Sequence, residues 1–424
     1  MPRVSLIVIL SLALAACQSS GGESASAQDG KAETSTEPAA STTTDVPGKP
    51  SFADWLEELK EEAMAAGVST ATFDNAFAAV RLNQEIIDKD REQSEFTKPI
   101  WSYLDSAVSP ERIANGQIKG SQYKPQLDAA AKRYGVPANI ILAIWGLESA
   151  YGQNMGGYNV IEALATLEYD NRRPGIFREQ LIDALQILEA GDIDAASMRG
   201  SWAGAMGQTQ FMPSAFKKYA VDADHDGRRD IWGDQADVFD STANYLIGSG
   251  WTPGVPWGAE VKLPANFPWD QAEIDIKKSV TEWRKLGVRL VNGGELPAVS
   301  SPASIIAPAG HRGPAFIVFK NFHTILAYNY SSAYALAVGQ LSDRLAGGAP
   351  LVATWPRDDQ PLTKDERVKL QELLSHLGYD PGGVDGVVGP KTRTALRQFQ
   401  RSIGEVPDGY PTSQLLQQLD EASS

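Results

Sequence analysis

The chain has 424 residues, of which 42% are hydrophobic and 21% are charged, and its formal net charge is −15. This length is sufficient for two or three domains with well-buried cores, and the composition is that of a globular protein. The acidic balance argues against a nucleic-acid-binding protein and is compatible with bound cations. No window of the sequence has the length of a membrane-spanning helix.

Residues 1–17 predict a secretory signal peptide and not a part of the fold. Arg3 precedes a short apolar run, and small residues lead to Cys17, which is the layout of a cleaved leader. The letters LAAC that end at Cys17 resemble the bacterial lipobox, whose cysteine is lipidated after cleavage. Cys17 is the only cysteine in the chain, which favours lipidation over a signal peptide with an incidental cysteine. Gln18, where a retained lipoprotein would have Asp, implies by resemblance delivery to the outer membrane. We therefore expect a periplasmic protein anchored in outer-membrane lipid.

Residues 18–50 predict a flexible tether. They are mostly Ser, Thr, Gly, Ala, Glu and Pro, and Val46 is their only large aliphatic residue. Such a segment cannot bury enough apolar area to fold.

Residues 51–350 predict one helical domain that carries a small β-containing insertion. Up to about residue 250 the apolar residues recur with helical spacing, and several of these stretches end in Gly. In residues 251–328, Pro and Gly become frequent, and the runs AEVKL, ASIIAPAG and AFIVFKN favour short strands. We expect helix to resume at SSAYALAVGQLSDRL.

Residues 351–361 predict a linker, and residues 362–420 predict a small separate domain. This last unit contains two helical patterns, KDERVKLQELLSHLGY and PKTRTALRQFQRSIG, and each is followed by an Asp-Gly turn. A domain of this size is too small to carry an enzyme site of its own beside a full core.

Glu148 stands within an otherwise apolar helical pattern, VPANIILAIWGLES. Ile141, Trp145 and Glu148 fall on one stripe of that helix. Glu148 is either a helix-edge residue whose head reaches water or a desolvated acid with a raised pKa. A desolvated acid would keep a proton to donate near neutrality, as the cleavage of a glycosidic bond requires.

Two flanking stretches are rich in small and aromatic residues. SAYGQNMGGYN adds two tyrosines and several glycines, which suit a sugar-lined groove, and RGSWAGAMGQTQFMPSAF contains Ser201 and Gln210. The second stretch could equally be a tightly packed core turn, in which Ser201 and Gln210 would be incidental.

Four motifs in order resemble the membrane-bound lytic murein transglycosylase B family: AIWGLESAYG, GSWAGAMGQTQFMPS, DADHDGRRDIW and AYNYSSAYALAV. The resemblance covers residues 51–345. It implies a lysozyme-like, mainly helical fold that cleaves the β-1,4 bond between N-acetylmuramic acid and N-acetylglucosamine in the glycan strands of peptidoglycan. It also implies a 1,6-anhydromuramoyl product instead of the addition of water.

The same resemblance assigns roles to individual residues. Glu148 matches the single catalytic acid/base of the family, and Asn329 is expected close to the scissile sugar. The remaining substrate-binding residues that it implies are Ser201, Gln210, Tyr245, Tyr328, Tyr334, Arg172 and Arg173.

A single acid is chemically sufficient for such a reaction, and no cofactor is expected for catalysis. Glu148 would protonate the leaving oxygen and then, as a carboxylate, take the proton from the muramoyl C6 hydroxyl that closes the anhydro ring. The acetamido group of the sugar, held by Asn329, would stabilise the cationic centre, as in substrate-assisted glycosidases. No second acidic residue stands beside Glu148 in the sequence.

The stretch DADHDGRRDIWGDQAD has the spacing of an EF-hand loop. The candidate ligands are Asp222, Asp224, Asp226, the carbonyl of Arg228, and Asp230. The twelfth position is Gly233 and not Glu, so the standard loop is incomplete, and the alternative is an acidic turn. In the family that the chain resembles, a later Asp completes a Ca²⁺ site. Asp237 aligns with it one residue further along than usual, and Asp234 is the alternative. We expect a structural Ca²⁺.

The C-terminal unit resembles the type 1 peptidoglycan-binding domain, a three-helix module. Its apolar residues are more consistent with a core than with a binding site; they are Leu370, Leu374, Leu377, Leu396 and Phe399.

Two other functions fit the same sequence. One is a catalytically silent wall-binding lipoprotein, and the other is a muramidase that hydrolyses the same bond with water. The chain has no phosphate-binding Gly-Lys motif, no dinucleotide fingerprint and no HExxH, and it indicates no protein partner among wall-synthesis enzymes.

Overall fold

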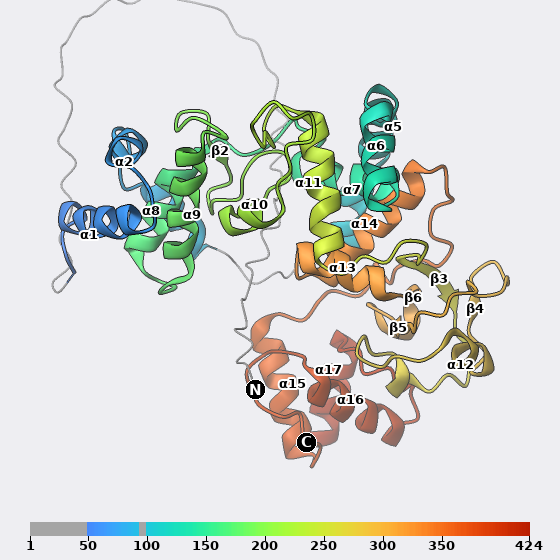
Figure 1. The fold of residues 1–424 in the computed structure, drawn as a ribbon. Coiled ribbons are helices and arrows are strands. Elements are labelled where there is room, and N and C mark those ends of the chain that lie inside the picture. Colours follow the sequence, from blue (N-terminus) through green and yellow to red (C-terminus); the bar gives the residue numbers. More distant parts are fainter. Residues whose placement is uncertain (1–48, 93–98) are drawn as a thin grey trace, which may run out of the picture.

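The computed structural model describes residues 49–92 and 99–424 (Figure 1). Helices predominate in this part, and the strands are few and short, so the expected mainly helical fold is confirmed. None of the described helices is long and apolar enough to cross a membrane. The predicted signal peptide, Cys17 and nearly all of the predicted tether lie outside the described residues.

A first helical lobe surrounds its own apolar core, at the left of Figure 1. Two of its helices begin at serine caps, since the side chains of Ser51 and Ser69 accept hydrogen bonds from the backbone N–H groups of Asp54 and Thr72. The helices of this lobe are α1 (Phe52–Ala65), α2 (Thr70–Phe77), α3 (Gln84–Arg91), α8 (Val160–Asp170), α9 (Ile176–Ala190) and α10 (Pro213–Tyr219).

A second helical lobe is built around α7 (Ala138–Ser149), whose residues are apolar on every side. Eight of its twelve residues are buried, as expected for a helix that other helices enclose. The helices around it are α4 (Ile100–Ala107), α5 (Pro110–Gln122), α6 (Lys124–Tyr134), α11 (Gln235–Gly248), α13 (Lys320–Tyr328) and α14 (Ser332–Leu345).

A two-stranded ladder links the segment after α7 to the segment that begins at Ser201. Strand β1 (Tyr158–Asn159) pairs antiparallel with β2 (Arg199–Gly200). Gly156 has a φ of +89°, and a Cβ atom there would lie 2.1 Å from the carbonyl oxygen of Gly200. The close approach of the two segments therefore requires glycine at this position.

The β-containing insertion forms one antiparallel sheet in the order β4-β3-β6-β5. Each of the three runs expected as strands contributes one, and their register places Ile317 opposite both Ala259 and Ile305. Helix α12 (Val280–Lys285) covers a separate apolar core on this sheet. The strands are β3 (Gly258–Lys262), β4 (Arg289–Leu290), β5 (Ser304–Ile306) and β6 (Ala315–Val318).

The sequence did not predict α13, because its residues fall inside the segment assigned to the insertion. The nine-residue helix KNFHTILAY contains β-branched Thr and Ile, and it directly follows a strand-like run. Local propensity therefore does not favour helix here. Burial of Phe322 and Ile325 in the core around α7 stabilises it instead.

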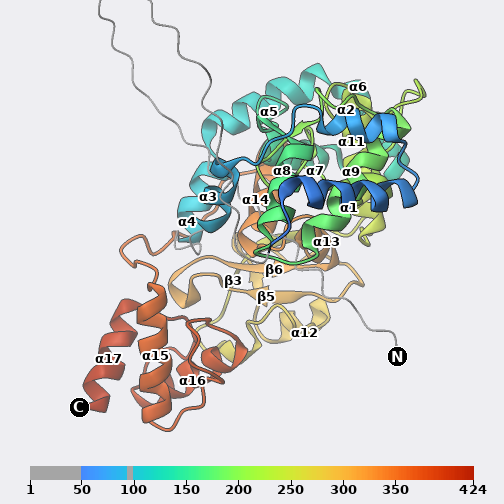
Figure 2. The ribbon, with the colours of Figure 1, turned by 90° about the vertical axis from the view of Figure 1, so that its left-hand side faces the viewer.

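The C-terminal domain has three helices, α15 (Lys364–His376), α16 (Pro390–Ser402) and α17 (Ser413–Ser423), around a small core. Both views place it beside the sheet insertion and away from α1 and α2 (Figure 2). Two polar contacts join it to the insertion. The carboxylate of Glu273 lies between Arg393 and Arg397, and His311 contacts Asp408.

Candidate active site

Glu148 lies in the last turn of α7, where the helix ends abruptly. The next two residues, Ala150 and Tyr151, have φ values of 50° and 61°, a left-handed conformation that is costly for residues with a Cβ atom. The turn is held by its contacts. Tyr151 is buried and its hydroxyl donates to the carbonyl of Arg112 at 2.9 Å, while the Ser149 hydroxyl accepts from the N–H of Gly152.

Glu148 as a whole is half-buried, and its carboxyl group points into the protein, where Tyr334 binds it. Burial raises its pKa to about 7, and the hydroxyl of Tyr334, which donates to Oε1 at 2.5 Å, partly offsets this rise. A group with this pKa is about half protonated at neutral pH. Of the two alternatives for Glu148, the hydrogen bond from Tyr334 and the raised pKa favour the desolvated acid over a head group in open water.

Tyrosines surround Glu148. Burial, and after it the negative charge of Glu148, raise the pKa of Tyr103, Tyr328 and Tyr334. Burial and the neighbouring Tyr219 raise that of Tyr245, to which Glu148 adds a smaller contribution. Among the described residues, no Asp, Glu, Lys or Arg contributes to the shift of Glu148 itself.

The aromatic rings form a connected cluster. The rings of Tyr245 and Tyr328 have centroids 4.6 Å apart, and Tyr328 stacks with Tyr334 at 6.4 Å. The hydroxyl of Tyr328 donates to the carbonyl of Thr209 at 2.8 Å, and that of Tyr245 donates to the carbonyl of Ala327 at 2.6 Å. Tyr328 packs against the cores of both helical lobes, so this cluster connects them.

Asn329 follows α13 directly and has a buried side-chain oxygen. This Oδ1 atom finds no hydrogen-bond donor among the described residues. An unmatched buried acceptor is rare and costs free energy, and a ligand that supplies an N–H or O–H group would satisfy it.

Ser201 and Gln210 lie at the two ends of a loop whose Thr209 carbonyl accepts from the hydroxyl of Tyr328. The Ser201 hydroxyl oxygen is buried and accepts from the N–H of Ala205 at 3.0 Å. Gln210 has a φ of 51°, and its side-chain amide donates to the carbonyls of Met155 and Gly207. Both residues therefore hold the loop in place, and neither contacts Glu148 directly by a hydrogen bond.

Gln208, which the sequence analysis did not single out, connects α7 to the acidic loop. Its Oε1 atom accepts from the indole N–H of Trp145 at 2.7 Å, and its amide donates to the carbonyl of Trp232 at 2.8 Å. A Cβ atom on Gly152 would lie 2.5 Å from the same Oε1. Gln208 is only 3% exposed. Since Trp145 lies one turn before Glu148, this hydrogen bond fixes the end of the helix.

Arg172 and Arg173 contact Asp90 and not Glu148. Arg172 forms an ion pair with the buried carboxylate of Asp90, and its Nη2 atom donates to the Asp90 carbonyl at 2.6 Å. The guanidinium of Arg173 lies 3.4 Å from the same carboxylate. Neither arginine shifts the pKa of Glu148, and the structure does not bring them into contact with it.

In the acidic loop, the carboxylates of Asp222, Asp224 and Asp237 come together, with oxygens within 4.8 Å of one another. None of the three forms a salt bridge with a described Lys or Arg. Asp226 and Asp230 hold the backbone of the same loop: Asp226 accepts from the N–H of Arg228, and Asp230 accepts from the N–H groups of Trp232 and Gly233.

Asp237 and Asp234 have different roles. Asp234 caps α11 by accepting from the N–H groups of Ala236 and Asp237. Asp237 is buried and accepts from the N–H groups of Ala223 and Asp230 at 2.7 and 2.6 Å. Three oxygen donors without a counter-ion suit a hard cation such as Ca²⁺.

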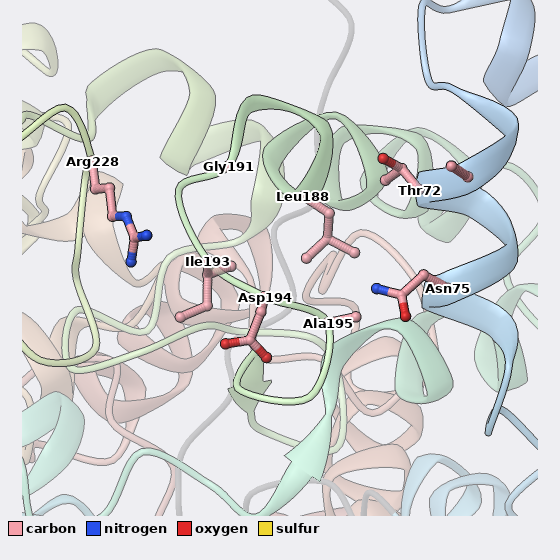
Figure 3. A pocket seen from close by; sticks show the side chains of 9 residues that line it. Thr72, Asn75, Leu188, Gly191, Ile193, Asp194, Ala195 and Arg228 are labelled. Carbon is pink, nitrogen blue, oxygen red and sulfur yellow. The ribbon is translucent and has the colours of Figure 1, made fainter.

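A cavity of about 430 Å³ lies apart from Glu148, between α2, the end of α9 and the acidic loop (Figure 3). Arg228 and Asp194 reach into it from one side and Thr72 and Asn75 from the other. Arg228 is the only predicted site residue in its lining. This cavity therefore does not belong to the surroundings of Glu148.

Comparison with known proteins assigns the chain to a family. Residues 51–343 match the model of the transglycosylase SLT domain. The chain belongs to this family. Residues 363–419 match the putative peptidoglycan-binding domain. The expected family, helical fold and C-terminal module are thus confirmed.

Three relatives illustrate the similarity. The membrane-bound lytic murein transglycosylase B of Escherichia coli K12 is 34% identical over 247 residues, which are 58% of this chain and 66% of the relative. SltB3 from Pseudomonas aeruginosa, in complex with NAG-anhNAM-pentapeptide, is 50% identical with a TM-score of 0.84 and covers 87% of this chain and 99% of its own. The E. coli lytic transglycosylase Slt35, in complex with calcium, is 28% identical with a TM-score of 0.60 and covers 70% and 93%.

The titration of Glu148 can be measured directly. We expect a pKa near 7 for the native chain, and a higher value for Tyr334→Phe, because that variant loses the hydrogen bond that stabilises the carboxylate. ¹³C NMR of glutamate-labelled protein would follow the titration, with Glu148→Gln identifying the signal. Tyr379→Phe, in the C-terminal domain, is the control and should leave the pKa unchanged. A native pKa near 4.5 would contradict the desolvation of this group.

Gln208→Met tests whether the hydrogen bonds of Gln208 hold the helix end. The variant keeps the side-chain volume but loses the hydrogen bonds to Trp145, Trp232 and Gln235, so we expect water to reach Glu148 and its pKa to fall by about one unit or more. Gln371→Met is the matched control, since Gln371 is equally buried and hydrogen-bonded in the C-terminal domain. Both variants should lose about 1–3 kcal/mol of stability. An unchanged pKa in Gln208→Met would show that Gln208 does not position Glu148.

Proposed function

We propose that this chain is a lytic transglycosylase that cleaves the β-1,4 bond between N-acetylmuramic acid and N-acetylglucosamine in peptidoglycan, with Glu148 as the single acid/base. The observation that carries the proposal is the desolvated Glu148 among tyrosines, with no second described carboxylate influencing its pKa. A carboxyl group with a pKa of about 7 can both donate and accept a proton at neutral pH. Membership of the transglycosylase SLT family supports the same reaction.

In the first step, Glu148 would donate its proton to the glycosidic oxygen as the bond to the muramoyl C1 breaks. The leaving sugar then departs with a free hydroxyl, and positive charge develops at C1. The acetamido group of the same sugar would stabilise this charge, and its N–H would donate to the unmatched Oδ1 atom of Asn329.

In the second step, the Glu148 carboxylate would take the proton of the C6 hydroxyl as its oxygen bonds to C1. This closes the 1,6-anhydro ring and returns the acid to its starting form, so that no water is consumed. The hydroxyl of Tyr334 would stabilise the carboxylate between the two steps.

Glu148→Gln should abolish cleavage, because an amide can neither donate the proton nor accept it. We expect a loss of at least about a thousandfold in the rate on isolated sacculi, in line with the contributions of general acid–base catalysis. Mass spectrometry of the products of the native chain should find 1,6-anhydromuramoyl ends.

The same digest separates the alternatives. Reducing muramoyl ends would indicate a muramidase, and intact sacculi would indicate a wall-binding protein without activity. Asp270→Asn is the control for handling and folding, because Asp270 is exposed on the insertion.

A bound Ca²⁺ is the second part of the proposal. The ligands would be Asp222, Asp224 and Asp237, together with the other groups at EF-hand spacing, which are Asp226, the carbonyl of Arg228 and Asp230. The Slt35 structure with calcium supports it. The ion would neutralise three close carboxylates and fix the loop that Gln208 joins to α7.

Added Ca²⁺ should therefore raise the unfolding temperature. At a hundred times its Kd, a ligand of the folded state contributes about 2.7 kcal/mol, which corresponds to an increase of several degrees for a domain of this size. Differential scanning calorimetry with Ca²⁺, Mg²⁺ or chelator measures it.

Asp237→Asn should lose most of the Ca²⁺-dependent increase, whereas Asp128→Asn, at an exposed surface position, should keep it. An equal unfolding temperature with Ca²⁺ and with chelator would contradict the site.

We also propose that the chain is a periplasmic lipoprotein of the outer membrane, anchored through lipidated Cys17. The lipobox-like sequence supports this, and the E. coli relative is named membrane-bound. The C-terminal domain would hold the glycan strands of the wall near the enzyme.

A further inference from the structure

The segment between α14 and α15, residues 351–361, is held against the catalytic part of the chain and passes α4 on its way to α15 (Figure 2). Strand β3 binds its first residues, since the carboxylate of Glu260 accepts from the backbone N–H groups of Val352 at 2.9 Å and Ala353 at 2.8 Å. Leu351 and Trp355 pack against the apolar core around α7. The predicted linker is therefore fixed by contacts over much of its length.

This segment contacts α4 at two places on one face of the helix. The indole rings of Trp355 and Trp101 have centroids 6.3 Å apart, and Trp101 is buried. One turn further along α4, the carboxylate of Asp105 accepts from both Nη1 and Nη2 of Arg357, at 2.7 and 2.9 Å. Both side chains of this ion pair are more than half exposed, so it contributes little, and the contact between the two indoles is the stronger of the two.

Helix α4 depends on such packing for its position. It has only eight residues, and its N-cap, Pro99, provides no side-chain hydrogen bond to the first N–H groups. A helix of this length is marginal in isolation and is stabilised mainly by the burial of its apolar residues, which here are Trp101, Leu104 and Ala107. The helix packs on α14 and, through Trp101, on Trp355. Loss of either surface would loosen it.

Tyr103 connects α4 to the acid. After burial, the charge of Glu148 is the largest cause of the raised pKa of Tyr103, and Tyr103 in turn raises the pKa of Tyr334, which binds Glu148. Tyr103 and Trp355 pack against the same apolar core. Arg112 acts on Tyr103 but not on Glu148. The titratable groups that face Glu148 are thus Tyr103 on α4, Tyr245 on α11, Tyr328 on α13 and Tyr334 on α14.

We propose that Trp355 is a positioning residue for the acid: it holds α4 in place through Trp101, and α4 keeps Tyr103 beside Glu148. The inference rests on the proposed function, in which Glu148 must be desolvated to keep its proton. Without the indole of Trp355, α4 loses packing at Trp101, and water reaches the carboxyl group past Tyr103. The segment that leads to the peptidoglycan-binding domain thus contributes to the catalytic site, although no residue of this described segment hydrogen-bonds to Glu148.

The test measures the pKa of Glu148 in the full chain, by ¹³C NMR of glutamate-labelled protein. We expect Trp355→Ala to lower this pKa by about one unit, because water stabilises the carboxylate. Trp355→Leu leaves a smaller cavity and should lower it by about half a unit, and it replaces the alanine variant if that variant does not fold. Trp355→Phe keeps a ring against Trp101 and should restore most of the native value. Arg357→Gln, on the same segment, is the matched control and should leave the pKa unchanged.

The pH dependence of the cleavage rate gives a second readout. With a pKa near 6 in place of about 7, about a tenth of the acid is protonated at pH 7 in place of about a half. We therefore expect Trp355→Ala to cleave sacculi about fivefold more slowly than the native chain at pH 7 and at nearly the native rate at pH 5.

Three results would overturn the inference. They are an unchanged pKa in Trp355→Ala, an equal fall in Arg357→Gln, and a rate that falls equally at pH 5 and pH 7, which would show that Trp355 only stabilises the fold. The pKa is measured without substrate. A native chain that cleaves nothing would therefore refute the proposed function and leave the pKa difference standing, whereas native cleavage with an unchanged pKa in Trp355→Ala would refute the positioning role alone.

Discussion

The desolvation of Glu148 is the constraint on which the rest of the site depends. A carboxyl group keeps its proton near neutrality only where water and cations are kept away from it. Helix α7 excludes water because it is buried on nearly every side, and the residues around its end are tyrosines, which are uncharged at neutral pH. A nearby arginine would ionise the acid. In agreement with this, Arg172 and Arg173 both contact the buried carboxylate of Asp90 and not Glu148.

A desolvated acid can act on a substrate only if its position is fixed. Fixing Glu148 requires strained backbone at the end of α7. The left-handed residues Ala150 and Tyr151 end the helix at Ser149. The buried hydroxyl of Tyr151 offsets part of this cost by donating to the carbonyl of Arg112. Gln208 then joins the helix to the acidic loop through Trp145 and Trp232. The order of that loop and the position of the acid are therefore linked through one buried amide.

The sequence alone predicts the features that depend on a local pattern of residues. The stripe that includes Glu148, the three strand-like runs and the spacing of the loop aspartates are all of this kind. Contacts between distant residues were not accessible in the same way. Tyr334 binds Glu148 across 186 residues, and Asp90 binds Arg172 across 82. The roles of Tyr103 and Gln208 could not be predicted, because their local sequence pattern does not differ from that of ordinary core residues. Helix α13 was missed since tertiary burial, and not propensity, determines it.

Two polar contacts fix the C-terminal domain against the rest of the chain. Burial would raise the pKa of Glu273, but Arg393 and Arg397 hold it below its usual value, so the carboxylate stays charged. Asp408 accepts from the backbone and the ring of His311. The approach depends on Gly310, where a Cβ atom would lie 2.4 Å from the Asp408 carboxylate. Removing one partner from a largely buried pair leaves an uncompensated charge, which costs more than the pair contributes. The orientation of the C-terminal domain is therefore specified by charge.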